Sequence, residues 1–96
     1  MKIYLSGRIT GKDIELVKLC FQSAETRFIS QGHEVVNPLK IDHNHDKSWE
    51  SYMKADIAEL LKCDAIYMIG DWYKSRGAML ELNIANELKL KTIFQS

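Results

Sequence analysis

The segment from Gly70 to Lys91 reads GDWYKSRGAMLELNIANELKLK, and the apolar run AIYMI occupies residues 65–69 directly before it. The run is short, rich in residues that favour β-structure and bounded by Gly70, which predicts a buried strand. Ser75 and Gly77 then begin a helix, and the Ser75 hydroxyl can cap its first turn. A helix that begins directly after a strand presents free backbone N–H groups and its positive dipole end at the strand exit.

Glu81 is the unusual residue of this helix. With about 100° of rotation per residue, the apolar residues form one broad arc, and Glu81 falls inside it between Leu88 and Ala85. A carboxylate in that position faces the sheet or a pocket, and burying a charge without a partner is costly. Two alternatives stay open. Glu81 belongs to a functional site, or it is a partly buried carboxylate that pairs with a basic residue or that a tilted helix leaves hydrated.

A second predicted helix, residues 48–62 with Ser48 as N-cap, repeats this pattern. Asp56 falls between Tyr52 and Trp49 on its apolar arc. Two helices therefore each place one carboxylate among apolar residues. In a fold with one ligand crevice this favours a paired-carboxylate site, in which one carboxyl attacks or stabilises an anomeric carbon and the other handles the proton.

The predicted elements alternate between strands and helices. Strands are expected at residues 2–6, 33–36, 64 or 65 to 69, and 92–94, and helices at residues 13–30, 48–62 and from 75 onward. This order predicts an α/β fold with a parallel sheet, helices on both faces and right-handed crossovers. Ligands of such folds bind beyond the carboxyl ends of the strands, which are here Ser6-Gly7, Asn37-Pro38 and Gly70-Asp71.

Composition indicates one globular domain spanning residues 1–96, with 46% hydrophobic and 27% charged residues. Thirteen basic and thirteen acidic residues cancel, which argues against broad binding to nucleic acids or membrane surfaces. No apolar run approaches the roughly 20 residues of a membrane span, and the apolar part of the amino terminus is too short for a signal peptide. Cys20 and Cys63 are expected to be reduced core residues, so we expect a cytoplasmic protein.

Two segments have the composition of an anion site. The loop from Gly7-Arg8 to Gly11-Lys12 combines glycines that permit close backbone approach with two cations. Its spacing is not that of a Walker A loop, and a plain tight turn is the alternative. In Ser75-Arg76-Gly77 a capping serine, an arginine and a helix amino terminus coincide. An ordinary N-cap with a solvent-facing arginine is the alternative there.

The remaining polar and aromatic signals are weaker. His43 and His45 invite a metal or nuclease interpretation, but their spacing defines no metal geometry, and a solvated loop is favoured. Trp72 and Tyr73 flank the expected crevice and could stack on a base. They could equally close the core or form a subunit interface.

Three stretches resemble the nucleoside 2-deoxyribosyltransferase superfamily: IYLSGRITG at 3–11, DIAELLKCD at 56–64 and SRGAMLELNIA at 75–85. The closest similarity is to a small subgroup formed by a domain of unknown function, and it covers nearly the whole chain. The resemblance implies a Rossmann-like or flavodoxin-like three-layer fold with a four- to five-stranded, mainly parallel sheet. It also implies a homo-oligomer, which the small size of the chain favours as well.

The resemblance further implies cleavage of the N-glycosidic bond of a nucleoside or nucleotide. Glu81 matches the family's nucleophilic glutamate, which attacks C1′, and Asp56 matches the aspartate that transfers a proton to the base. Tyr4 matches the tyrosine that positions the nucleophile, and Gly7 and Gly77 match the loop glycines.

Ser75 refines the substrate that the resemblance implies. Transferases acting on free nucleosides tend to carry an aspartate at this place, which meets the sugar 5′-hydroxyl, whereas the deoxynucleotide N-hydrolases of the superfamily have a serine and bind a 5′-phosphate. Ser75 beside Arg76 and a helix amino terminus suits a phosphate. We therefore expect a nucleoside 5′-monophosphate, with its phosphate at Arg8, Ser75 and the helix and its base covered by Trp72 or Tyr73.

The expected reaction is hydrolysis or base transfer through a covalent glycosyl–Glu81 intermediate, without a metal or other cofactor. As alternatives, the pocket binds or senses a nucleotide without cutting it, or the protein is a structural α/β oligomer whose carboxylates pair with basic neighbours. A nucleophilic Glu81 requires that the helix end and any nearby arginine, which lower its pKa, outweigh burial, which raises it.

Overall fold

The computed structural model describes residues 1–96, and strands and helices alternate in it as the sequence predicts. In chain order the elements are β1 (Lys2–Gly7), α1 (Ile14–Ser30), β2 (Glu34–Val36), η1 (Pro38–Lys40), α2 (Trp49–Leu60), β3 (Ala65–Ile69), η2 (Trp72–Lys74), α3 (Arg76–Glu87) and β4 (Lys91–Phe94). Asp13, Ser48 and Ser75 each precede an α-helix and accept a hydrogen bond from its first turn through the side chain. This confirms the predicted caps Ser48 and Ser75.

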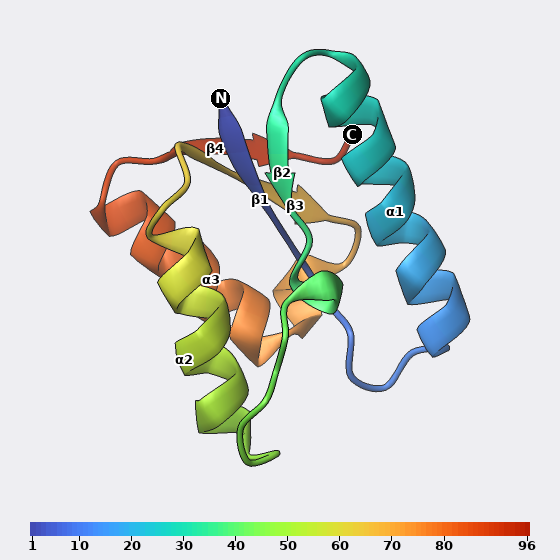
Figure 1. Ribbon diagram of the computed structural model, residues 1–96, viewed down its shortest axis with the longest axis vertical. Coiled ribbons are helices and arrows are strands. Elements are labelled where there is room, and N and C mark those ends of the chain that lie inside the picture. The colour runs from blue at the N-terminus through green and yellow to red at the C-terminus, as the bar shows by residue number, and fades with distance from the viewer.

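The four strands form one parallel sheet in the order β2-β1-β3-β4. Tyr4 of β1 pairs with Val36 on one side and with Ile66 on the other, so β1 lies inside the sheet. The helix α1 covers one face, and α2 and α3 cover the other (Figure 1). The predicted α/β fold, with helices on both faces of a parallel sheet, is confirmed. Because the chain moves from β1 to β2 in one direction and then crosses to β3 and β4, the switch point lies between β1 and β3.

The sheet divides the core into two clusters, because successive side chains of a strand point to opposite faces. The cluster under α1 consists of Ile3, Leu5, Val17, Phe21, Ala24, Phe28, Ala65, Tyr67 and Ile69. The cluster under α2 and α3 consists of Tyr4, Leu60, Cys63, Ile66, Met68, Ala78 and Ala85. This alternation turns Tyr4 and Ser6 toward α3, while Ile3 and Leu5 pack beneath α1. The polar face of β1 thus reaches the carboxyl edge of the sheet on the side of α2 and α3.

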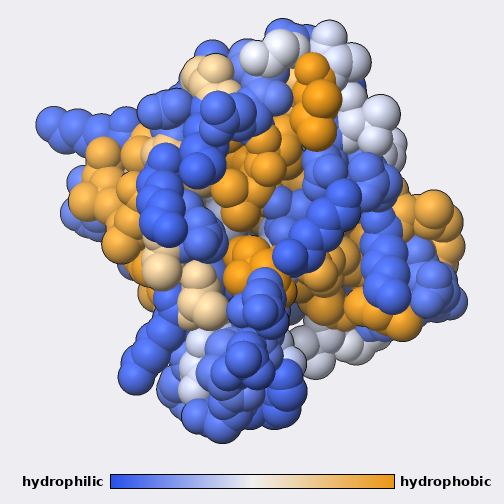
Figure 2. Space-filling model, viewed as in Figure 1, coloured by the Kyte–Doolittle hydropathy of each residue, from blue (hydrophilic) through white to orange (hydrophobic).

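The helix α1 buries a narrower stripe than its sequence predicts. Its buried residues are Val17, Phe21, Ala24 and Phe28. Leu16 is 59% exposed, and Cys20 is exposed as well, so the prediction that Cys20 is a core residue was wrong, whereas Cys63 is buried. Both residues lie beside the narrow stripe, on the flank of the helix that faces away from the sheet. Apolar surface consequently appears over α1 at the right of Figure 2.

None of the helices combines the length and the apolar character that crossing a membrane requires.

Replacing Phe21 by alanine is expected to lower the free energy of unfolding by about 3–5 kcal/mol. The reason is that Phe21 is 2% exposed within the cluster between α1 and the sheet. Leu19→Ala is the matched control, because Leu19 lies on the same helix but is 66% exposed, and its loss should stay within about 0.5 kcal/mol. Urea unfolding followed by circular dichroism measures both values. Equal losses in the two variants would contradict this packing.

Candidate active site

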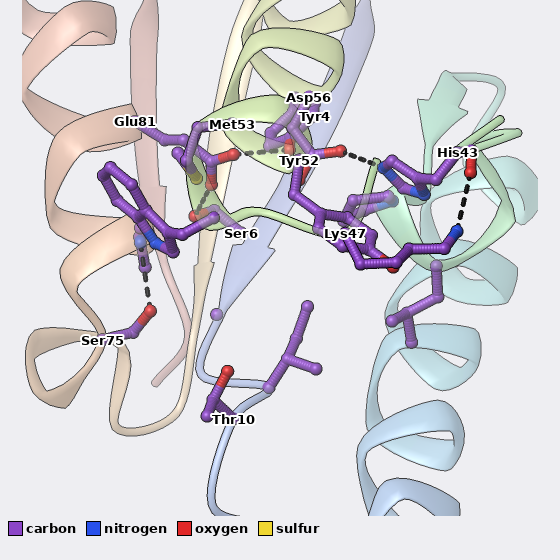
Figure 3. Close-up of a pocket in the computed structure, with 17 residues that line it drawn as sticks. Tyr4, Ser6, Thr10, His43, Lys47, Tyr52, Met53, Asp56, Ser75 and Glu81 are labelled. Atoms are coloured by element: carbon purple, nitrogen blue, oxygen red, sulfur yellow. Dashed lines mark hydrogen bonds and ion pairs between the residues drawn. The ribbon is translucent and has the colours of Figure 1, made fainter. Parts of the chain in front are cut away.

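A cavity of about 490 Å³ opens at the carboxyl edge of the sheet. Its walls come from β1 and the loop that follows, from residues 38–47, from α2 and from the start of α3 (Figure 3). The lining residues are Tyr4, Ser6, Gly7, Ile9, Thr10, Pro38, Leu39, His43, Lys47, Trp49, Tyr52, Met53, Asp56, Ser75, Gly77, Ala78 and Glu81. The cavity therefore brings together six of the residues that the sequence singles out: Tyr4, Gly7, Asp56, Ser75, Gly77 and Glu81.

Glu81 is a buried carboxylate with both oxygens hydrogen-bonded, and it is 5% exposed. Tyr4 Oη donates to Oε2 at 2.6 Å, and Ser6 Oγ donates to Oε1 at 2.7 Å (Figure 3). The buried small residues Ala78 and Ala85 flank Glu81 on α3 and allow this helix to pack closely on the sheet. The expectation that Glu81 faces the sheet or a pocket is confirmed. No lysine or arginine forms an ion pair with it.

Burial raises the pKa of Glu81 to about 7, from an ordinary value of 4.5. The hydrogen bonds from Tyr4 and Ser6 lower this pKa, and the negative charge of Asp56 raises it, but burial is the largest influence. Ionised and protonated Glu81 therefore coexist near neutral pH. The pKa of Tyr4 is raised well above 10.0, first by burial and then by the Glu81 charge, so Tyr4 remains a hydrogen-bond donor.

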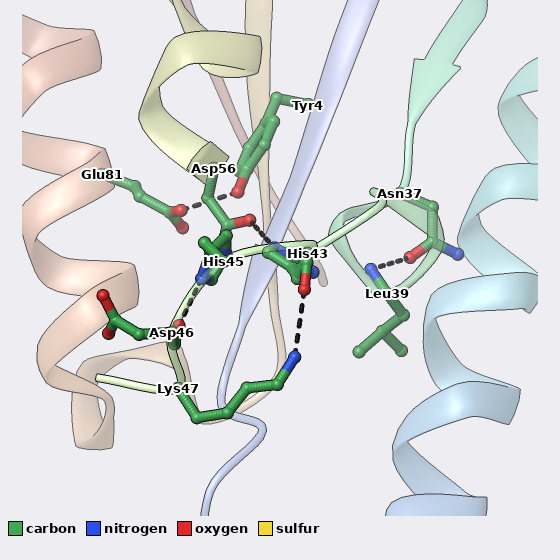
Figure 4. A network of polar contacts seen from close by, with 9 residues as sticks. All are labelled: Tyr4, Asn37, Leu39, His43, His45, Asp46, Lys47, Asp56 and Glu81. Atoms are coloured by element: carbon green, nitrogen blue, oxygen red, sulfur yellow. Dashed lines mark hydrogen bonds and ion pairs between the residues drawn. The ribbon is translucent and has the colours of Figure 1, made fainter. Parts of the chain in front are cut away.

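Asp56 projects from α2 into the same cavity, and its side chain is 14% exposed. His43 Nε2 lies 2.8 Å from Oδ1 of Asp56 (Figure 4), while Oδ2 has no hydrogen-bond partner in the protein. Burial raises the pKa of Asp56, and the hydrogen bond with His43 opposes that shift. The two carboxylates thus differ: Glu81 is held by both oxygens, and Asp56 by one.

The segment that carries His43 and His45 is a loop, as expected, and Asp42, Asn44 and Asp46 are exposed in it, but the rings of His43 and His45 are half-buried against α2. The ring centres of His43 and His45 lie 4.7 and 4.9 Å from that of Tyr52, respectively. Lys47 Nζ donates to the His43 carbonyl at 3.0 Å (Figure 4). The helix α2 thus gives His43 an aromatic partner in Tyr52 and a polar partner in Asp56. No group of three or more His, Cys, Asp or Glu side chains is arranged to hold a metal ion.

The amino terminus of α3 opens into the cavity through Ser75 and Gly77. Ser75 Oγ accepts a hydrogen bond from the Ala78 N–H at 3.1 Å, whereas no backbone carbonyl accepts from the N–H groups of Arg76 and Gly77. Gly77 fits closely, because a Cβ atom there would lie 3.1 Å from the Met53 sulfur. Free N–H groups at a helix amino terminus suit an anion.

The two arginines expected at the phosphate do not line the cavity. Arg8 Nη1 lies 3.2 Å from Asp71 Oδ2, and Lys12 Nζ lies 3.2 Å from Asp71 Oδ1. The Arg76 guanidinium lies 3.7 Å from the ring centre of Trp49. Arg8 and Lys12 thus contact a carboxylate of the protein, and Arg76 contacts an aromatic face. Lys47 is the one lysine or arginine among the lining residues.

Trp72, expected to cover the base, also lies outside the cavity lining. Its ring packs 5.6 Å from that of Phe94 and against the core cluster under α2 and α3. Tyr73 is 58% exposed. The aromatic side chains of the cavity are Trp49 and Tyr52 of α2, together with Tyr4 of β1. The apolar arc of α2 contained Trp49 and Tyr52, but only the orientation of the helix shows that they face a cavity.

The sequence places Ser6 at the ligand-binding edge of the sheet but does not predict its contact with Glu81, and it does not predict that His43 and Lys47 line the cavity. Ser6 stands two positions after Tyr4 on the same strand, so the alternation of strand side chains predicts that both lie on the same face of the sheet. His43 and Lys47 lie in a segment without periodicity. The sequence feature that indicates a role for them is their place after the carboxyl end of β2, because ligands of this fold class bind at that edge of the sheet.

Replacing Glu81 by glutamine is expected to remove a pH dependence of stability. The pKa of Glu81 is about 7 in the folded protein and lower in the unfolded chain, so the folded state holds the Glu81 proton more tightly. Protonation of Glu81 therefore favours the folded state, and this stabilisation is lost as pH rises. Between about pH 4.5 and about pH 8, the wild type should lose about 3 kcal/mol relative to Glu81→Gln. Urea unfolding at both pH values measures this. Glu87→Gln, at an exposed position of α3, controls for the loss of one carboxylate. A difference in unfolding free energy between wild type and Glu81→Gln that does not change with pH would contradict the burial of Glu81.

A structural comparison finds the same fold in a solved enzyme. The chain is similar to a 2-deoxyribosyltransferase from the psychrotolerant bacterium Bacillus psychrosaccharolyticus, described as a biocatalyst for the synthesis of antiviral and antitumoral nucleosides. The two share 25% sequence identity, with a TM-score of 0.75, over 98% of this chain and 71% of that chain. This finding confirms the resemblance to nucleoside 2-deoxyribosyltransferases.

Comparisons of sequence place the chain in a family. No curated protein matches it. The family model described as Domain of unknown function (DUF4406) matches residues 1–94, nearly the whole chain. The protein therefore belongs to the DUF4406 family.

Proposed function

We propose that this protein cleaves the N-glycosidic bond of a nucleoside 5′-monophosphate, by hydrolysis or by transfer to a second base. The observation that carries the proposal is the buried Glu81 carboxylate, which Tyr4 and Ser6 hold by both oxygens in a cavity that Asp56 also lines. Two carboxyl groups in one cavity suit nucleophilic attack and proton transfer at an anomeric carbon. The similarity to a 2-deoxyribosyltransferase supports the same class of bond. A homo-oligomeric state and a cytoplasmic location stay predictions from the sequence.

The two carboxyl groups divide the reaction between them. In the protonation state that reacts, the pair carries one proton, and it lies on Asp56. Ionised Glu81 attacks C1′ of the sugar while the bond from C1′ to the base nitrogen breaks, and Asp56 gives its proton to the departing base. A glycosyl ester of Glu81 and an ionised Asp56 result. Water, or a second base, then attacks C1′ and releases Glu81, and Asp56 takes the proton of the attacking group. Tyr4 and Ser6 orient the nucleophile throughout, since each donates to one of its oxygens.

The start of α3 supports a phosphorylated substrate. The free N–H groups of Arg76 and Gly77 and the Ser75 hydroxyl lie at the positive end of the helix dipole. A serine adds no negative charge at this place, whereas an aspartate would repel a phosphate. Lys47 supplies one cation to the cavity wall. The phosphate in this proposal is therefore bound chiefly by backbone groups, and the aromatic rings of Trp49 and Tyr52 offer apolar surface for the base.

The raised pKa of Glu81 favours a second candidate function. A carboxyl group with a pKa of about 7 is partly protonated at neutral pH, and a protonated glutamate is no nucleophile. The same cavity would then bind a nucleotide without cutting it, as a sensing module. Glu81→Gln separates the two candidates, because it removes the nucleophile but keeps an oxygen that can accept a hydrogen bond.

Wild-type protein is expected to release free base from a panel of ribo- and deoxyribonucleoside 5′-monophosphates, as measured by chromatography. Glu81→Gln should lower the rate by at least about a thousandfold, since no other group replaces the nucleophile. Glu87→Gln, on an exposed face of the same helix, should keep the wild-type rate. Nucleotide binding without base release would instead support the sensing module, and release by Glu81→Gln at the wild-type rate would refute the assigned nucleophile.

Ser75→Asp tests the phosphate. Aspartate caps a helix as well as serine does, so the fold should persist, but its charge should raise KM for a 5′-monophosphate about tenfold, equivalent to about 1.4 kcal/mol of repulsion. Ser75→Asn is the neutral control, because asparagine also caps a helix and adds no charge. The KM for an unphosphorylated nucleoside should not rise in either variant. Unchanged KM values for monophosphates in Ser75→Asp would rule out a phosphate at this place.

A further inference from the structure

His43 forms a polar contact with Asp56, and the reaction proposed above assigns this histidine no role. Its Nε2 atom lies 2.8 Å from Oδ1 of Asp56, and the side chains of His43 and Asp56 are 15% and 14% exposed. The histidine belongs to an irregular segment between η1 and α2, yet its ring points into the cavity wall toward Asp56 (Figure 4). Neither core cluster includes this pair.

Three contacts fix the orientation of the His43 ring and its backbone. The ring packs on Tyr52 at 4.7 Å and on His45 at 5.2 Å between ring centres. The His43 carbonyl accepts a hydrogen bond from Lys47 Nζ at 3.0 Å. Side chains held in this way present a ring nitrogen in one direction only, and here that direction is Oδ1 of Asp56.

The contact distinguishes the two oxygens of Asp56. His43 engages Oδ1, while Oδ2 has no hydrogen-bond partner in the protein and is not sealed from solvent. A carboxyl group that delivers a proton needs one oxygen that is held and one that is free to meet the base. His43 thus creates the asymmetry that such a proton donor requires.

Building on the proposed function, we propose that His43 is a positioning residue that holds Asp56 by Oδ1 and thereby aims Oδ2 at the leaving base. In the first half of the reaction, the proton moves from Oδ2 to the base nitrogen as the bond from C1′ to the base breaks. His43 then donates through Nε2–H to the ionised Asp56 and stabilises it until the attacking water or base returns a proton to Oδ2. No proton is gained or lost over the full cycle.

Several charged or titratable groups surround this pair. Tyr52 of α2 and His45 and Lys47 of the same segment lie against His43. The negative charge of Asp56 also raises the pKa of Tyr4 on β1 and of Glu81 on α3, which lie across the cavity. Burial raises the pKa of Asp56, and the hydrogen bond with His43 and the charges of His43 and His45 lower it. Loss of this bond should therefore raise the pKa of Asp56 further.

The experiment compares His43→Phe, His43→Gln and His45→Phe. His43→Phe keeps an aromatic ring against Tyr52 but removes the nitrogen, and His43→Gln places an amide N–H near the position of Nε2. His45→Phe is the matched control, because His45 has the same ring contact to Tyr52 but makes no hydrogen bond to Asp56. Amide NMR spectra confirm that each variant is folded.

Two readouts follow from this design. We expect His43→Phe to lower kcat about a hundredfold, within the range of proton-transfer effects, with KM changed less than about threefold. His43→Gln should recover at least about tenfold of that loss, and His45→Phe should resemble the wild type. Carbon-13 NMR of the Asp56 carboxyl should show a clearly larger rise of its pKa in His43→Phe than in His45→Phe, because His45 acts on Asp56 through its charge alone and His43 also through a hydrogen bond.

The two readouts separate this inference from the proposed function. A wild type that releases no base refutes the proposed function, whatever the NMR titration shows. An Asp56 pKa that stays unchanged in His43→Phe overturns the inference, whether or not the wild type is active. So does an equal loss of kcat in His43→Phe and His43→Gln, because positioning by a hydrogen-bond donor would then play no part.

Discussion

Burial of the Glu81 carboxylate is the constraint on which the rest of this structure depends. A carboxylate removed from water is strongly destabilising unless hydrogen bonds replace its hydration. Tyr4 and Ser6 provide them at 2.6 and 2.7 Å, in the range of strong bonds between a hydroxyl and an ionised acceptor. The compensation is incomplete, since the pKa remains about 7. The protein therefore holds a carboxylate that is oriented by its neighbours and is only partly stabilised as an anion.

The topology of the sheet makes this arrangement possible. Because β1 is an interior strand, its alternate residues point toward α3 at fixed spacing, and both Tyr4 and Ser6 meet one carboxylate. The crossover of α2 on the same face brings Asp56 to the other side of the cavity. Gly77 favours the close approach of α2 and α3, since a Cβ atom there would lie 3.1 Å from the Met53 sulfur, which would have to shift slightly.

Features that depend only on residues close together in the sequence could be predicted. The alternating order of elements, the Ser48 and Ser75 caps and the inward orientation of Glu81 follow from local periodicity and capping chemistry. The partners of long side chains could not be read in this way. Arg8, expected at a phosphate, pairs instead with Asp71, and that choice depends on two loops that meet only in the folded structure. His43 was missed for the same reason, because its segment has no periodicity.

The hydrogen bond from Tyr4 to Glu81 joins residues 77 positions apart in the chain. The cavity exists only after the first strand and the third helix have met, so it forms with the most non-local contacts of the fold and carries their loop-closure entropy. A ligand that bridges β1 and α3 would bind the folded state and not the unfolded chain. Its affinity would appear directly as added resistance to thermal unfolding, growing with the logarithm of ligand concentration. For a chain of 96 residues, occupancy of this cavity is thus coupled to the integrity of the whole molecule.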